Sequence, residues 1–257
     1  MANPLQNFVQ SLSRGLSVLS VLAESSSPLN LTEISHQLRL SKSTIQRLTF
    51  TLLQLGYLNR NKETKKFRLG PKILSLGFAA IRNLDLKEVA YPYLEETSRE
   101  VGETVNLAVL DGTEIVYVER IRTQQILNIN LNVGSRLPVH CTSMGKTILA
   151  FLPNNRLEEV LKKIELPSLT SLTITSKKGL KKELGKIARR GFAINNEELS
   201  NGLRSVAAPI KNHNGEVIAA VNIAVPSIRV SLKRLETVLA RKVVETADKI
   251  SFMLGYK

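Results

Sequence analysis

The first 70 residues contain two short helix signals separated by a tight connection, and no other feature of the sequence constrains the fold as much. Asn30, followed three residues later by Glu33, predicts the capped start of one helix. Ser41 predicts the cap of the next helix, and Gly56 predicts where that helix ends. Two helices joined this closely are typical of a helix-turn-helix.

An amphipathic helix precedes this pair, and a basic hairpin follows it. Leucines spaced at i, i+4 and i+7 predict that the first helix buries one face. The side chains expected on that face are Leu12, Leu16, Leu19 and Leu22 or Ala23. Residues 57–60 and 67–69 alternate as two strands around the polar loop 61–66. Together these elements predict a winged helix-turn-helix domain over residues 1–70.

The third helix of this module has an apolar stripe and a polar face. The stripe expected to pack on the other two helices is Ile45, Leu48, Leu52 and Leu55. The polar face suits the major groove of B-DNA, which is about 12 Å wide. Arg can pair with guanine and Gln with adenine, whereas Ser and Thr more often hold phosphates. The DNA-facing residues predicted on this helix are Lys42, Ser43, Thr44, Gln46 and Arg47.

The charge distribution agrees with a polyanionic partner. The chain carries 36 Lys+Arg and 22 Asp+Glu, a formal net charge of +14. Residues 1–84 contain 11 Lys+Arg and 3 Asp+Glu, so +8 of that charge falls on a third of the chain. The wing cations predicted to contact the DNA backbone or an adjacent minor groove are Lys62, Lys65, Lys66 and Arg68. A solvated face on a small structural bundle is the alternative interpretation.

The pattern changes after residue 70. Pro71 suits the first turn of a helix, and we expect residues 71–84 to form a linker helix. Residues 85–257 mix helices with strands, and Asp111-Gly112 and Asn214-Gly215 mark hairpin turns. Strands are expected near 105–110, 115–118, 126–131, 192–195, 204–210 and 217–225, and helices near 86–100, 143–151, 156–163, 178–190 and 231–253. The second domain is predicted to be α/β with an antiparallel sheet, which makes the chain an α+β two-domain protein.

Residues 138–146 carry the strongest small-molecule signal in the second domain. Thr142 or Ser143 can cap the helix that follows, and the free amides of its first turn suit a carboxylate or phosphate. Gly145 allows the close approach of a ligand or of another backbone. An ordinary capped helix packed on the sheet is the alternative. Lys146 is expected to be a solvated or salt-bridged helix residue.

The sequence gives little support for a catalytic site or a metal-binding site. Cys141, the single cysteine, adjoins His140, but neighbours on an extended strand point to opposite faces and are poorly placed as a nucleophile pair. One cysteine also excludes an intrachain disulfide. No apolar run approaches the roughly 20 residues that span a bilayer. We expect a cytoplasmic protein with no cofactor, no metal site and no membrane partner.

Four motifs occur in order along the chain. They are SLSRGLSVL (11–19), GETVNLAVL (102–110), LPVHCTSMGK (137–146) and NEELSNGLRSVAAPI (196–210). In these motifs the chain, from about residue 9 to its C-terminus, resembles the IclR family of bacterial and archaeal transcription regulators. The resemblance implies a winged helix-turn-helix joined by a helix to a GAF-like effector domain. It also implies homodimers or dimers of dimers, and binding to palindromic DNA operators.

The resemblance further implies that a small organic acid binds between the helix-start loop and the sheet. The implied effector contacts are Ser143, Met144, Gly145, Asn195, Ser205, Asn222 and Ala224. In relatives that bind very small keto acids, Asn195 is replaced by Asp, Ser205 by Cys, and Asn222 and Ala224 by Ser. A neutral amide at 195 does not repel an anion and can donate as well as accept hydrogen bonds, so the pocket is expected to be polar but tuned differently from those of these relatives. A glyoxylate or pyruvate specificity is therefore not transferred to this chain. FVQSL (8–12), with CTSMG and GLRS, is similar to the branch that controls aromatic-acid catabolism.

These features predict a DNA-binding transcription regulator that responds to a small acid and is not an enzyme. The effector is expected to shift the relative placement of two DNA-binding heads in the dimer through the helix 71–84. The alternatives are a ligand-independent DNA-binding repressor and an enzyme that acts on a small carboxylate. Repression and activation remain equally open, as do dimer and tetramer.

Overall fold

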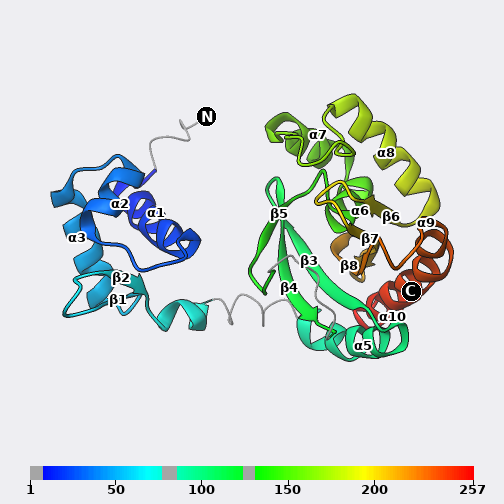
Figure 1. The fold of residues 1–257 in the computed structure, drawn as a ribbon, viewed down its shortest axis with the longest axis horizontal. Coiled ribbons are helices and arrows are strands. Elements are labelled where there is room, and N and C mark those ends of the chain that lie inside the picture. Colours follow the sequence, from blue (N-terminus) through cyan, green and yellow to red (C-terminus); the bar gives the residue numbers. More distant parts are fainter. Residues whose placement is uncertain (1–7, 77–85, 124–130) are drawn as a thin grey trace. The chain divides into compact units, whose positions relative to one another are not determined.

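A computed structural model describes residues 8–76, 86–123 and 131–257 (Figure 1). The chain divides into two compact units, residues 1–83 and 84–257, which we describe separately. Residues 72–76 are helical, and the rest of the expected linker helix 71–84 lies largely outside the described residues. The strand expected near 126–131 lies outside them as well, except for its last residue.

Up to Leu69, the described part of the first unit contains three helices and a two-stranded sheet (Figure 1). The helices are α1 (Gln10–Glu24), α2 (Leu31–Leu38) and α3 (Lys42–Gln54), and β1 (Leu58–Arg60) pairs antiparallel with β2 (Phe67–Leu69). Every element contributes to one core, whose buried members are Val18, Leu22, Leu29, Ile34, Ile45, Leu58 and Phe67. This is the helix-turn-helix followed by a hairpin that the sequence predicts.

The local signals around the turn act as predicted. The Asn30 side chain accepts hydrogen bonds from the amides of Thr32 and Glu33 at 2.9 and 3.0 Å, and the Glu33 carboxylate accepts one from the Asn30 amide at 2.6 Å. This reciprocal arrangement is a capping box. Ser41 Oγ accepts from the Thr44 amide at 3.2 Å and caps α3. The helix-turn-helix is therefore held by local hydrogen bonds as well as by its core.

Two predicted apolar stripes are partly wrong. On α1 the buried residues are Val18 and Leu22, whereas Leu12 and Leu16 are 62% and 56% exposed. The first half of α1 contributes nothing to the core cluster of the described residues, so its leucines remain in solvent. On α3, Leu55 is exposed as well, because the helix ends at Gln54.

The buried face of α3 instead pairs Ile45 with Thr49. The Thr49 hydroxyl donates to the Ile45 carbonyl at 2.8 Å, which satisfies it inside the core. A search for apolar periodicity overlooks such a threonine, because threonine is polar. Its hydrogen bond to the backbone is what allows it to be buried.

The second unit is built on a six-stranded antiparallel sheet in the order β5-β4-β3-β8-β7-β6. The strands are β3 (Thr104–Asp111), β4 (Glu114–Ile121), β5 (Arg136–Pro138), β6 (Ala193–Asn196), β7 (Leu203–Lys211) and β8 (Val217–Pro226). The sequence predicts all of these except β5, which it assigns to a loop. Because β5 pairs only three residues with β4, it is too short to show a strand periodicity.

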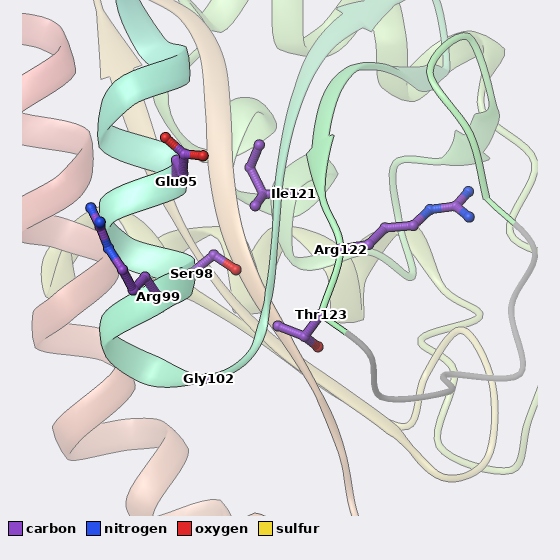
Figure 2. A pocket seen from close by; sticks show the side chains of 7 residues that line it. All are labelled: Glu95, Ser98, Arg99, Gly102, Ile121, Arg122 and Thr123. Atoms are coloured by element: carbon purple, nitrogen blue, oxygen red, sulfur yellow. The ribbon is translucent and has the colours of Figure 1, made fainter.

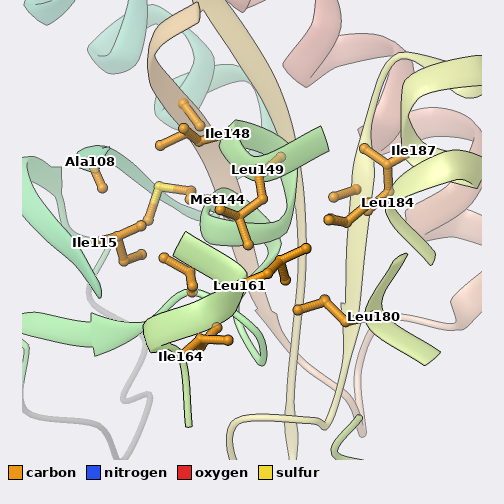
Figure 3. Packing of buried hydrophobic residues seen from close by; sticks show 14 of the residues in the cluster. Ala108, Ile115, Met144, Ile148, Leu149, Leu161, Ile164, Leu180, Leu184 and Ile187 are labelled. Carbon is orange, nitrogen blue, oxygen red and sulfur yellow. The ribbon is translucent and has the colours of Figure 1, made fainter. Parts of the chain in front are cut away.

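Three helices cover one face of the sheet (Figure 1). They are α6 (Ser143–Phe151), α7 (Asn154–Lys163) and α8 (Lys177–Arg190). Figure 3 shows their large apolar side chains converging, with Met144, Leu149 and Leu161 close to the sheet. The sheet contributes small residues to this cluster, among them Ala108, Ala207 and Ala220, which let α6 lie close to the strands.

The remaining helices are α5 (Leu86–Val101) and α10 (Ala240–Met253), which contact each other and the sheet. One continuous helix is expected over residues 231–253, but α9 (Leu232–Arg234) and a π-helical turn (Leu235–Leu239) precede α10. Such π turns are rare and occur mostly as single turns inside α-helices, so the sequence predicts one continuous α-helix here. In the described part of the chain, no helix combines the length and the apolar character that a membrane span requires.

Candidate functional site

The side chains predicted to face DNA lie together on one exposed side of α3. Lys42, Ser43, Gln46 and Arg47 are exposed, and Thr44 is half-buried. The Ser41 hydroxyl contacts those of Ser43 and Thr44 at 3.0 and 2.9 Å, so the helix start presents a cluster of hydroxyl groups. Within the described ranges, neither lysine nor arginine of this face forms an ion pair, which leaves both cations available to an external anion.

The wing between β1 and β2 presents further cations. Asn61 Oδ1 accepts hydrogen bonds from the amides of Glu63 and Thr64, both at 2.9 Å, which fixes the turn. Lys65 adopts a positive φ of 58° at the tip. The predicted wing contacts Lys62, Lys65 and Arg68 are exposed, and Lys66 is half-buried. A rigid turn therefore presents these cations to solvent.

Sequence reasoning missed one residue of the α3 face. Phe50 is 62% exposed although it lies in the middle of the helix. It falls outside the predicted apolar stripe and was therefore given no role. The signal that identifies it is a large apolar residue four positions after Gln46 and three after Arg47.

In the second unit, the implied effector residues converge on the sheet face that α6 covers. Asn195 on β6 lies opposite Ser205 on β7, and Ser205 lies opposite Ala224 on β8. Residues directly opposite each other in antiparallel strands point to the same face, so these three form one row. Ser143, in the first turn of α6, contacts the row from above: its hydroxyl lies 2.7 Å from that of Ser205.

Asn222, two residues before Ala224, extends the polar surface to β3. Asn106 on β3 lies opposite Asn222, and its Nδ2 donates to Asn222 Oδ1 at 2.7 Å. Asn195 Oδ1 accepts from the Glu198 amide at 2.9 Å. We refer to the set of Asn106, Ser143, Asn195, Ser205 and Asn222 as the polar layer, and all five are at least 96% buried. Its members bond mainly to one another and to nearby backbone.

Where β3 pairs with β4, two buried polar groups lack a partner among the described residues. Asn106 Oδ1 is one, and Nε of Arg120 is the other. Arg120 lies opposite Asn106 in the pairing of β4 with β3, and burial lowers the pKa of its guanidinium. Sequence reasoning missed both residues, because each lies inside an apolar strand and only the strand register brings them together.

The start of α6 has the predicted cap, and at Gly145 it shows one of the two alternatives that the sequence predicts. Thr142 Oγ1 accepts from the Gly145 amide at 3.2 Å, which confirms the predicted cap. A Cβ at Gly145 would lie 2.4 Å from Val139 Cα and 2.5 Å from the Val139 carbonyl oxygen. At Gly145 the helix therefore lies close to the backbone of Val139. A contact of Gly145 with an effector stays a prediction. The first-turn amides of Ser143 and Met144 remain for another acceptor.

Of the two alternatives predicted for Lys146, the structure shows the salt bridge and not the solvated side chain. Lys146 is 1% exposed, donates to the Ile194 carbonyl at 2.7 Å and pairs with the Glu198 carboxylate. Burial raises the pKa of Glu198 despite the adjacent cation. The pair links α6 to the loop after β6, directly beside the polar layer.

The environments of Cys141 and His140 do not favour a nucleophile. Burial raises the pKa of the fully buried Cys141 thiol to about 12, so the thiolate is scarce at neutral pH. His140 Nε2 instead lies 3.1 Å from the Pro167 carbonyl, and burial lowers the pKa of its imidazole. No group of three His, Cys, Asp or Glu residues is placed to hold a metal ion within the described ranges.

A separate open hollow lies between α5 and the end of β4 (Figure 2). Glu95, Ser98 and Arg99 line it from α5, and Figure 2 shows Arg122 pointing away from that helix. No member of the polar layer lines this hollow. It is therefore distinct from the implied effector site.

Comparison with known proteins identifies two family models. The model described as the IclR helix-turn-helix domain matches residues 11–62, and the model described as the bacterial transcriptional regulator IclR C-terminal domain matches residues 78–252. Among curated proteins, the HTH-type transcriptional regulator XynR of Escherichia coli K12 is 34% identical over 96% of this chain and 98% of its own length. The Pca regulon regulatory protein of Pseudomonas putida is 35% identical over 90% of this chain and 79% of its own.

Solved structures agree with these matches. A transcriptional regulator from Rhodococcus sp. RHA1 superposes with a TM-score of 0.82 and 37% identity, covering 96% of this chain and 98% of that one. An IclR homologue from Microbacterium hydrocarbonoxydans, complexed with 4-hydroxybenzoate, gives a TM-score of 0.83 at 28% identity, covering 95% and 99%. Both similarities span the two units of the chain.

Proposed function

The chain belongs to the IclR family of DNA-binding transcriptional regulators, and from this premise we propose which residues bind its operator and its effector. The observation that carries the proposal is the exposed side of α3, where hydroxyl, amide and guanidinium groups lie together without ion-pair partners among the described residues. We assign base reading to Gln46 and Arg47, which can form bidentate contacts with adenine and guanine. Phosphate contacts fall to Lys42, Ser43 and Thr44 at the helix start.

The wing supplies sequence-independent affinity. Lys62, Lys65, Lys66 and Arg68 contact the DNA backbone or an adjacent minor groove in this proposal. Their exposure on a fixed turn supports the assignment. Their charge contributes a salt-dependent affinity that is alike for all sequences.

A homodimer, or a dimer of dimers, is proposed to place two heads on a palindromic operator. The exposed apolar side chains Val9, Leu12 and Leu16 on and before α1 support a protein contact in the first unit. A symmetric pair of heads requires a symmetric pair of half-sites, which is the reason to expect a palindrome.

The second unit is proposed to bind a small organic or aromatic acid at the polar layer. The effector contacts are Ser143, Met144, Gly145, Asn195, Ser205, Asn222 and Ala224. The first-turn amides of α6 and the nearby cation Arg120 support an anionic ligand, and Asn106 Oδ1 offers an acceptor for a ligand hydroxyl. The 4-hydroxybenzoate bound by the relative from Microbacterium hydrocarbonoxydans carries both a carboxylate and a hydroxyl group, which supports a ligand of the same chemical class here.

The effector acts by population shift rather than by chemistry in this proposal. It favours one of two arrangements of the DNA heads, and it can do so only by as much as its affinity differs between them. Linkage then requires operator DNA to change effector affinity by the same factor. Burial keeps the Cys141 thiol protonated, which supports a regulator without enzymatic activity. The regulator is proposed to work in the cytoplasm, together with its operator DNA.

The DNA-binding half of the proposal is tested with the full-length chain. Binding sites are selected from a pool of random DNA duplexes and sequenced. We expect an enriched palindrome, bound with an affinity that falls steeply as salt increases. Selection of no sequence at all would contradict base reading by α3.

The effector half is tested by thermal shift with 4-hydroxybenzoate, other aromatic acids, keto acids and sugar acids. A ligand at 100 times its Kd stabilises the folded state by about 2.7 kcal/mol, which gives a clear increase in Tm. Ser143→Trp should abolish the shift because the much larger indole blocks the position from which Ser143 contacts Ser205. Ser168→Trp, at an exposed position, is the control and should retain it. A shift that survives Ser143→Trp, or an effector Kd unchanged by operator DNA, would contradict the proposal.

A further inference from the structure

An exposed phenylalanine lies on a helix face that is otherwise polar. Phe50 is 62% exposed in the middle of α3 and is not a member of the core of the first unit. Of its four neighbours on the helix surface, Gln46, Arg47 and Gln54 are exposed polar residues, and Leu53 is half-buried against the core of the first unit. Leaving an aromatic ring in water is unfavourable relative to burying it, so a partner that covers Phe50 gains affinity from it.

The position of Phe50 in the helix matches that of a base-reading residue. Counted from Ser43, the residues Gln46, Arg47 and Phe50 occupy positions i+3, i+4 and i+7. These four positions lie on one side of a helix, and the recognition helix of the homeodomain uses the same spacing for its base contacts. Seven residues of α-helix span about 10.5 Å, so a single major groove accommodates the whole set.

The chemistry of the ring restricts what it can recognise. A phenylalanine side chain has no hydrogen-bonding group, so it cannot read the donors and acceptors of the groove floor. The apolar group that base pairs present in the major groove is the C5 methyl of thymine. We propose that Phe50 is a specificity-determining residue that packs on a thymine methyl, beside the bases read by Gln46 and Arg47. This inference rests on the proposed placement of α3 in the major groove.

A contact with DNA explains this position better than a contact with protein. The other exposed apolar side chains of the first unit that lie near one another in sequence are Phe8, Val9, Leu12 and Leu16, on and before α1, and Leu74 and Leu76, after β2. Phe50 is instead surrounded by the amide and guanidinium groups that suit base edges. A protein interface would have to bury Arg47 along with the ring, which is costly without an anionic partner.

The test replaces thymine by deoxyuridine, which removes only the methyl group. Each thymine of the selected operator is exchanged in turn, and Kd is measured by fluorescence anisotropy at one salt concentration. For the natural chain, we expect the exchange at one thymine of a half-site to weaken binding about fourfold, the factor that burial of one methylene-sized group provides. For Phe50→Ala, the same exchange should have no effect, while the exchanges elsewhere keep theirs.

Two further variants separate the ring from its surroundings. Phe50→Leu keeps an apolar group and should keep part of the sensitivity to the methyl. Leu55→Ala removes another exposed apolar side chain at the end of α3 and should keep all of it. Because Phe50 is outside the core, Phe50→Ala should unfold at the same temperature as the natural chain, which circular dichroism checks.

Three outcomes would overturn the inference. One is a natural chain that binds every uracil-substituted operator equally well, and another is a methyl sensitivity that persists in Phe50→Ala. In both of these cases Arg47→Ala should still change the base preference, so the proposed base reading by Arg47 would stand. If no operator is selected at all, the proposed placement of α3 fails and the assignment of Phe50 fails with it.

Discussion

The exposed face of α3 and the buried polar layer of the second unit are made of similar side chains, yet their hydrogen-bonding states are opposite. On α3, Arg47 and Gln46 point into solvent. In the polar layer, Ser143 and Ser205 contact each other at 2.7 Å, and Asn106 donates to Asn222. A ligand meets free groups at the first surface, whereas at the second most of the side chains already form hydrogen bonds that stabilise the fold, and few groups, such as Asn106 Oδ1, lack a partner.

Because of this difference, a substitution at one site affects binding alone, whereas a substitution at the other affects both binding and stability. An exposed side chain exchanges water for DNA, so changing it alters binding and leaves folding nearly intact. A buried, hydrogen-bonded side chain supports the fold, so changing it alters stability as well as binding. The predictions below test this separation, in order of decreasing effect.

The largest effect is expected from Lys146→Ala. The variant leaves the Glu198 carboxylate buried beside the polar layer without its cation, which should lower the free energy of unfolding by about 3–5 kcal/mol. Urea unfolding, followed by tyrosine fluorescence, reports on it, since four of the five tyrosines lie in the second unit. Lys181→Ala is the matched control. Its pair with Glu158, at 2.6 Å, is half-exposed and should contribute at most about 1 kcal/mol. Equal losses for the two variants would contradict the distinction between buried and exposed groups.

Arg47→Ala should show the converse behaviour. We expect it to lose about 1–3 kcal/mol of discrimination at one base position, because one bidentate contact is removed. Its urea unfolding curve should coincide with that of the natural chain. Binding of operators with single base changes, measured by anisotropy, gives the discrimination. An unchanged base preference would show that α3 meets DNA with a different face.

Ser205→Ala tests the polar layer without removing a charge. The variant leaves the Ser143 hydroxyl without its partner, which should lower the free energy of unfolding by about 1 kcal/mol. Ser168→Ala removes an exposed hydroxyl, which donates to the Thr170 carbonyl at 3.0 Å, and should change stability much less. If Ser205→Ala is as stable as this control, the Ser143–Ser205 contact does not stabilise the fold.

The smallest effect is expected from Lys65→Ala on the wing. It should weaken binding to all DNA sequences alike and reduce the slope of log K against log salt by about 0.9, because one phosphate contact is lost. Lysine and alanine meet the same restriction at the positive φ of this residue, so the turn itself should be retained. Titrations at several salt concentrations measure the slope. A changed base preference would move Lys65 from the backbone to a base edge.

The sequence predicts those parts of the fold that local interactions decide. The Asn30 and Ser41 caps depend on residues within three positions of each other, and both are present. Burial on α1 and α3 was harder to predict, since a leucine such as Leu12 is buried only where a distant element covers it. The sequence does not reveal β5, because three residues are too few to show an alternation, or the π-helical turn, because such turns are rare inside α-helices.

The candidate sites show the same division. The α3 face follows from one helix, so its polar members can be identified from spacing alone, although Phe50 is overlooked because it is apolar and falls outside the predicted apolar stripe. The polar layer joins residues from β3, β6, β7, β8 and α6, and their proximity depends on strand register. Motif resemblance identified Ser143 and Ser205, while Asn106 and Arg120 required the pairing of β3 with β4.

The backbone contact at Gly145 bears on how regulators of this kind can evolve. Even alanine would place a carbon atom 2.4 Å from Val139 Cα, and a backbone, unlike a side chain, has no alternative rotamer with which to move away. No series of single replacements therefore leads gradually away from glycine at this position. New effector preferences should arise instead by substitution in the polar layer, where one side chain meets another. Descendants of such a chain can thus diversify in what they sense while inheriting the start of α6 unchanged.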